Sequence, residues 1–267
     1  MDFSEAARGA KIYCTIKISS FEINITQTTV SLFAVTVFLM LMAFIVTRRI
    51  SKRPGKLQVI VEKLVTMLYD LVEGTMGKHN IGFAPYIGTL FLSSFFCSTI
   101  GMTYVFRSAT ADLMVTLAWA LVTSVLVWFF NIKNYGFFAW LKGFTEPIII
   151  MTPMNIVSEI AQPVSMAFRH FGNMVGGSVL TTIIYTALGG ATSLAFGWIS
   201  QTVASIPFLQ VGIPAFLSIY FDLFSGFVQA LVFSLLTMVY VGAACPPPEE
   251  RKQRKKNKNK KSAVDAA

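Results

Sequence analysis

The sequence predicts an all-α integral membrane protein with about five transmembrane helices, including a long tilted pair, and one interfacial amphipathic helix. Three observations lead to this fold class. Hydrophobic residues make up 54% of the chain and charged residues only 13%. Several apolar runs reach the ~20 residues that cross ~30 Å of hydrocarbon. Lys and Arg gather beside the ends of these runs, as expected for cytoplasmic loops.

The first span is predicted at residues 28–47, after an N-terminal segment, residues 1–27, that has no apolar core. By the positive-inside rule, the end of the span that carries many cations is cytoplasmic. We therefore expect the N-terminal segment to face outward. The cations that follow the span are Arg48, Arg49, Lys52, Arg53 and Lys56.

An amphipathic helix is predicted at residues 57–73. Its polar residues recur at spacings of three and four, which places them on one helical face, with leucine and valine on the other. Such a helix lies in the membrane interface, although a surface helix packed on the spans explains the pattern equally well. The polar residues are Glu62, Thr66, Asp70 and Glu73.

The second and third spans are predicted at residues 86–106, after Pro85, and at residues 113–132. A short turn on the outer side joins them. Lys133 and Lys142 mark the inner end of the third span. Both spans have the composition of ordinary bundle helices.

Two later stretches are longer than one perpendicular crossing. Residues 153–188 are helix-compatible over about 36 residues, roughly 54 Å, so this helix must tilt, kink near Pro163, or break. Gly189 and Gly190 are expected to begin the next turn. The last span is predicted at residues 213–244, which closes a membrane domain of residues 28–245.

A basic tail, residues 246–267, begins with three prolines and is expected to be disordered and cytoplasmic. Of the 22 Lys and Arg, eight lie between Arg251 and Lys261. We interpret the tail as an anchor on membrane lipids rather than a nucleic-acid site. The three cysteines indicate neither a disulfide framework nor a metal site. Without a phosphate-binding loop or cofactor fingerprint, the chain is expected to have no catalytic site and no cofactor.

Few ionisable residues lie within the predicted long pair of helices. An arginine at bilayer depth costs from about 3 to more than 10 kcal/mol, and therefore indicates a function. Arg169 lies about 16 residues into its helix, too deep to reach the interface unless the helix tilts. The ionisable residues are Glu159, Arg169, His170 and Asp222.

Polar residues accompany Arg169 in two stripes. Ser165, Arg169 and Asn173 are spaced by four and share one helical face. On the last helix Asp222 and Gln229 are seven residues apart and also share a face. Two polar stripes in an apolar protein favour a hydrated path between the helices.

Other interpretations of these residues remain open at this point. Arg169 and Asp222 would also suit a buried salt bridge that only ties two helices together, or the substrate site of a secondary transporter. Inverted repeats would support a transporter, but none is visible among the five spans. A structural membrane anchor would explain the amphipathic helix and the tail, but not the arginine.

Four stretches of the chain resemble subunit a of the F-type ATP synthases. Met166-Ala-Phe-Arg169-His-Phe-Gly172-Asn173-Met is similar to the family's Leu-Arg-Leu-Phe-Gly-Asn-Met signature. Gln229-Ala-Leu-Val-Phe233 through Thr237-Met-Val-Tyr240 resembles its Gln-Ala-x-x-Phe and Leu-Thr-x-x-Tyr blocks. Residues 54–62 and 110–118 also look like the family. The resemblance runs from about residue 24 to residue 243.

The resemblance implies a non-catalytic stator subunit that passes protons or Na⁺ through two half-channels to a rotating c-ring. Arg169 would face a carboxylate on each passing ring subunit and prevent ions from slipping straight across. The implied partners are the c-ring, the peripheral-stalk b subunits and, indirectly, the soluble ATPase head. The implied location is a bacterial plasma membrane.

The resemblance also implies roles for other residues. Asn173 and Gln229 match polar positions near the arginine and the outer path, and Glu159 matches an acidic position on the inner path. Ser178 and Asp222 fall where the family often has an interacting pair, and Asp222 would be the outer proton relay.

Two positions depart from the family pattern. His170 replaces an apolar residue, and Met114 stands where Asn is common. We interpret His170 as a packing or hydrogen-bonding variant rather than a relay, because it points about 100° away from Arg169.

Overall fold

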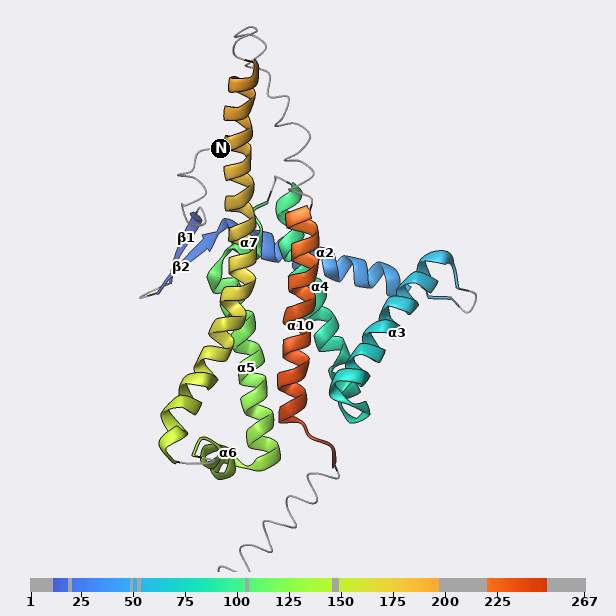
Figure 1. The fold of residues 1–267 in the computed structure, drawn as a ribbon. Helices are drawn as coiled ribbons and strands as arrows, with labels where there is room; N and C mark the ends of the chain where they lie inside the picture. Colours follow the sequence, from blue (N-terminus) through green and yellow to red (C-terminus); the bar gives the residue numbers. More distant parts are fainter. Residues whose placement is uncertain are drawn as a thin grey trace, which may run out of the picture. The chain divides into compact units, whose positions relative to one another are not determined.

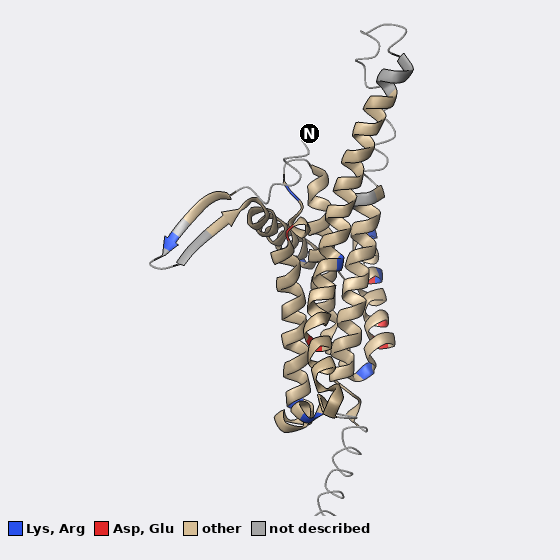
Figure 2. Ribbon diagram, turned by 60° about the vertical axis from the view of Figure 1, so that its left-hand side comes forward, with Lys and Arg blue, Asp and Glu red and all other residues tan. Residues whose placement is uncertain are grey.

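The computed structural model describes residues 12–18, 21–48, 50–51, 54–103, 106–145, 149–196 and 220–248. Within these ranges, five helices are long and apolar enough to cross a membrane, which confirms the predicted helical membrane fold (Figure 1). Charged side chains are sparse along these helices (Figure 2). The main helices are α2 (Gln27–Arg48), α3 (Lys56–Met76), α4 (Ala84–Thr99), α5 (Leu113–Tyr135), α6 (Phe137–Gly143), α7 (Thr152–Phe196) and α10 (Ser225–Ala244).

A β-hairpin precedes the first helix and is not among the predicted elements. Strands β1 (Ile12–Ile18) and β2 (Phe21–Thr26) pair antiparallel, with Ile18 opposite Phe21 and Ile12 opposite Thr26. Both strands are rich in isoleucine and threonine, whose branched Cβ atoms suit an extended backbone. The N-terminal segment therefore contains regular secondary structure.

Helix α3 covers the residues of the predicted amphipathic helix, 57–73, and its place in the membrane interface stays a prediction. Val72 and Met76 near its C-terminal end are buried, whereas Leu57 and Leu64 nearer its start are exposed. α3 ends at Gly77, whose positive φ of 82° favours glycine. A 3-10 turn, Lys78–Phe83, then leads into α4.

The second span ends earlier than expected. α4 stops at Thr99 and is followed by 3-10 turns at Ile100–Thr103 and Ala109–Ala111. At Gly101 the chain passes close to Ser108: a Cβ on Gly101 would lie 3.2 Å from the Ser108 Cβ. This close approach turns the chain back toward α5 and explains the early end of α4.

Helix α7 is a single helix of 45 residues with Pro163 inside it. Of the three expected possibilities, a tilt, a kink or a break, the break does not occur. The predicted turn at Gly189 and Gly190 is wrong, because α7 continues to Phe196. Each residue added to an existing helix adds a hydrogen bond, and this gain outweighs the weak helix propensity of two glycines.

A π-helical turn, Tyr220–Phe224, precedes α10. The last span was predicted to begin at residue 213, and residues 213–219 lie outside the described residues. π-turns inside or beside α-helices are rare and often occur at functional sites. Asp222 lies in this turn.

The chain forms two compact units. The first contains residues 1–43, 92–117 and 167–231. Within it, α2 contacts α4 through the rings of Phe38 and Phe96, whose centroids are 5.2 Å apart. α4 contacts α10 through Phe95 and Phe227, at 6.0 Å.

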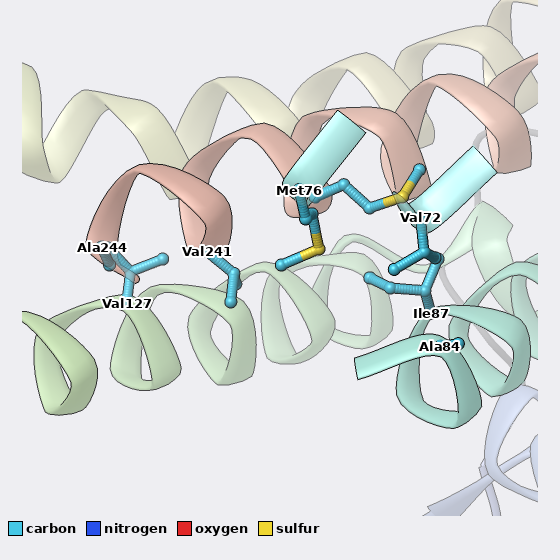
Figure 3. Close-up of a cluster of buried hydrophobic side chains, with 8 residues drawn as sticks. Val72, Met76, Ala84, Ile87, Val127, Val241 and Ala244 are labelled. Atoms are coloured by element: carbon cyan, nitrogen blue, oxygen red, sulfur yellow. The ribbon is translucent and has the colours of Figure 1, made fainter. Parts of the chain in front are cut away.

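The second unit contains residues 44–91, 118–166 and 232–267. Its interior is an apolar cluster contributed by α3, α4, α5 and α10 (Figure 3). Gly242 of α10 lets Met76 of α3 approach, with the Met76 Cγ 3.5 Å from where a Cβ would stand. The cluster consists of Val72, Met76, Ala84, Ile87, Val127, Met238, Val241 and Ala244.

Candidate functional site

Arg169 lies on an exposed face of α7. The buried face of this part of the helix repeats at positions i, i+3, i+4 and i+7, the spacing of one helical stripe. Ser165, Arg169 and Asn173 lie off that stripe, and all three are exposed. The buried residues are Pro163, Met166, Ala167 and His170.

Arg169 forms no ion pair with any acid whose side chain the structure describes. The side chain of Asp222 lies outside that set, so the predicted pairing of Arg169 with Asp222 stays a prediction. A guanidinium is permanently charged and presents five N–H donors in a planar fork that matches a carboxylate. On an apolar helix, such a group needs an anionic partner.

Two residues predicted for the polar stripes meet directly in the first unit. Asn173 Nδ2 of α7 donates a hydrogen bond of 2.7 Å to Gln229 Oε1 of α10. Gln229 is only 4% exposed, and a buried amide of this kind is costly unless it is hydrogen-bonded. The bond fixes the two helices at a point one turn from Arg169.

His170, next to Arg169, is buried at 1% exposure and lies among hydroxyl groups of the first unit. Its Nε2 is 3.5 Å from Ser94 Oγ and 3.5 Å from Ser98 Oγ, both on α4. Ser98 Oγ is 3.2 Å from Thr110 Oγ1, which is 2.9 Å from Ser108 Oγ. We call these five residues the His170 cluster.

Glu159 occupies a polar site in the second unit. Trp128 of α5 donates its indole N–H to Glu159 Oε1, at 2.5 Å, and both side chains are half-buried. The indole can only donate, so it fixes one carboxylate oxygen and leaves the other available.

The remaining predicted residues have simpler surroundings. Ser178 is exposed, and its hydroxyl donates to the carbonyl oxygen of Val175 at 2.8 Å. Asp222 lies in the π-turn, and its side chain is outside the described residues. The predicted contact between Ser178 and Asp222 therefore stays a prediction.

Sequence reasoning missed the partners of His170 and Glu159. Ser94 and Ser98 are four residues apart on one helix, which is a visible stripe signal. Trp128 gives no such signal, because it lies among apolar residues of α5 and 31 positions from Glu159 in sequence.

Asp112 caps α5 by accepting a hydrogen bond from the Met114 amide at 3.0 Å, and it also accepts one from Thr28 Oγ1 at 2.8 Å.

No group of three His, Cys, Asp or Glu residues suited to a metal ion is found among the residues that the structure describes. The described residues of this site offer a permanent cation, hydrogen-bonding amides and hydroxyls, and a carboxylate. Such groups can transfer or steer small cations.

Comparison with known proteins assigns this arrangement to a family. The family described as ATP synthase A chain matches residues 28–242. ATP synthase subunit a, sodium ion specific, of Propionigenium modestum is 33% identical over 232 residues, covering 81% of this chain and 73% of its own length. ATP synthase subunit a of Bacillus subtilis (strain 168) is 31% identical over 240 residues, covering 86% and 95%. These matches exclude the transporter and anchor interpretations.

Proposed function

This chain belongs to the family of ATP synthase subunit a, the non-catalytic, ion-translocating stator subunit of the membrane sector, and we propose that its ion translocation depends on Arg169. It is a multi-pass membrane protein of a bacterial ATP synthase. We propose below which residues of the chain carry out the translocation and which surfaces they face.

One observation carries the assignment of Arg169. Its side chain is exposed on α7, between exposed Ser165 and Asn173, while the next residue, His170, is buried. A permanent cation on the exposed face of an apolar helix needs an opposite charge, and an exposed guanidinium can reach such a charge on a neighbouring protein. We infer that this neighbour is the c-ring, and that the charge is a carboxylate on each passing ring subunit.

In this mechanism Arg169 holds the approaching ring carboxylate in its ionised form and releases the bound ion. The guanidinium cannot deprotonate, so it also blocks a direct path for ions between the two sides. Two half-channels, each open to one side of the membrane, then force the ion to travel with the ring for most of a turn. The ion, a proton or Na⁺, binds to the ring carboxylate.

The outer half-channel is assigned to the polar residues of the first unit. Asn173 and Gln229 line it beside Arg169, and their 2.7 Å hydrogen bond supports a fixed amide pair there. Asp222, in the π-turn that precedes α10, is the proton relay, with Ser178 as its polar neighbour. Ser165 extends the face that meets the ring.

The inner half-channel is assigned to Glu159 of the second unit. The Trp128 indole donates to one of its oxygens, which supports a carboxylate held in one orientation with the other oxygen free to accept an ion. A half-buried acid in an otherwise apolar surrounding is a reasonable entry point for a cation.

The proposed orientation places residues 1–27 outside and the basic tail, residues 246–267, in the cytoplasm, on either side of a membrane domain of residues 28–245. The cations that follow α2 and those of the tail support this orientation. The peripheral-stalk b subunits and, through them, the soluble ATPase head are the other proposed partners.

The test is Arg169→Ala in the complete ATP synthase, reconstituted into vesicles. We expect ATP-driven ion pumping to be lost while the complex still assembles, because the Arg169 side chain is exposed. Lys133→Ala, which removes an exposed cation of α5, is the matched control and should pump normally. Coupled pumping by the Arg169→Ala complex would contradict the assignment.

A further inference from the structure

We propose that His170 is a positioning residue for Arg169: its imidazole, anchored on hydroxyl groups of α4, fixes the rotation of α7 about its own axis. This inference rests on the proposed function of Arg169. It assigns a role to His170, which stands at a position where the subunit a family usually has an apolar side chain.

The direction of the hydrogen bonds in the His170 cluster follows from counting protons. Ser98 donates its single hydroxyl proton to the Ser94 carbonyl oxygen at 2.9 Å. Ser108 donates its proton to the Cys97 carbonyl oxygen at 2.9 Å. With its proton on that carbonyl, Ser98 offers only lone pairs to His170, so this contact is a hydrogen bond in the tautomer that carries the proton on Nε2.

The cluster suits an anchor, because the Ser98 and Ser108 hydroxyls donate to backbone carbonyl oxygens. One N–H shared between Ser94 Oγ and Ser98 Oγ also explains why both contacts are long, at 3.5 Å, as in other three-centre bonds. A buried donor that loses such acceptors costs about 1–3 kcal/mol, so the imidazole is held in place.

Close packing leaves the anchor little room to move. A Cβ on Gly226 of α10 would lie 3.1 Å from the Ser98 Cβ, so α10 packs directly against the serine that accepts a hydrogen bond from His170. Thr110, fully buried, contacts Ser98 from the turn before α5. Ser98 of α4 is thus held in place by α10 and by the turn before α5.

Helical geometry transmits this anchor to Arg169. Consecutive residues of an α-helix are about 100° apart around the axis, so fixing His170 on the buried side fixes Arg169 on the exposed side. Asn173 provides a second anchor through its bond to Gln229. No described atom lies within 4 Å of the Cβ positions of Gly172 and Gly176, so those residues do not resist rotation.

The test compares three complexes, each assayed per assembled enzyme for ATP-driven pumping and for passive ion leak. His170→Leu removes the donor, and we expect pumping to fall several-fold and leak to rise, because a turned Arg169 no longer blocks slippage. His170→Gln places an amide N–H at about the position of Nε2 and should restore both values. Thr186→Ala is the control, since Thr186 is exposed and its hydroxyl donates to the Thr182 carbonyl oxygen of its own helix.

Three results would overturn the inference. They are normal pumping without leak in His170→Leu, a loss confined to the amount of assembled complex, and a His170→Gln complex as defective as His170→Leu. Arg169→Ala assayed in parallel separates this inference from its premise. If that complex pumps, the proposed function fails; if it does not pump while His170→Leu does, only the role of His170 fails.

Discussion

The two units of the chain share helices α4 and α10, which make different contacts in each. In the second unit α4 and α10 pack through apolar side chains such as Ile87, Met238 and Val241. In the first unit they contact α7 through hydrogen bonds of Ser94, Ser98 and Gln229. We therefore expect substitutions in the second unit to change mainly assembly, and substitutions in the first unit to change mainly transport.

The largest effect on assembly should come from the apolar cluster. Met238→Ala removes a side chain that is fully buried, and such a cavity costs about 2–5 kcal/mol. We expect much less assembled complex, with normal pumping per complex, measured by comparing enzyme yield with pumping. Met154→Ala, at an exposed position, is the control. A pumping defect per complex would break the comparison between the units.

A large effect on transport should come from the first unit. Asp222→Asn keeps the size of the side chain but removes its titratable group, so we expect translocation to slow several-fold while assembly is unchanged. Ion flux through vesicles that contain equal amounts of complex measures this effect. Asp70→Asn, on the exposed face of α3, is the control. Unchanged flux in Asp222→Asn would remove Asp222 from the path.

The smallest effect should come from a polar contact in the second unit. Trp128→Phe removes the indole donor to Glu159 but keeps a ring of similar shape, so the carboxylate remains and only its orientation loosens. We expect a modest fall in pumping at unchanged yield. Trp140→Phe is the control, because the Trp140 indole packs against the rings of Phe137 and Phe144. A loss of yield instead would place Trp128 with the packing residues.

Much of the helical architecture follows from the sequence, because the membrane imposes length and hydropathy. The predicted run at residues 28–47 corresponds to Gln27–Arg48, and that at 113–132 to Leu113–Tyr135. The two glycines at residues 189–190 led to a wrong prediction of a turn, since an established helix can continue through two poor helix formers. The β-hairpin had a readable signal in its branched residues, whereas the seven-residue α6 is too short for a periodic pattern.

The candidate site is predictable only where its residues share one helix. The stripe of Ser165, Arg169 and Asn173 follows from a spacing of four. The contacts of His170 with Ser94 and Ser98 join residues 76 and 72 positions apart, and nothing in the spacing indicates which helices will pack together. The rotation of α7, and with it the exposure of Arg169, therefore comes from tertiary contacts.

The central claim is that Arg169 faces a carboxylate of the rotor and not an acid of its own chain. An experimental structure of the complete membrane sector tests this claim most directly, through the distances from the Arg169 guanidinium to the nearest carboxylates. We predict a ring carboxylate within salt-bridge distance in at least one rotary state. A guanidinium turned away from the ring and paired with Asp222 would contradict the account.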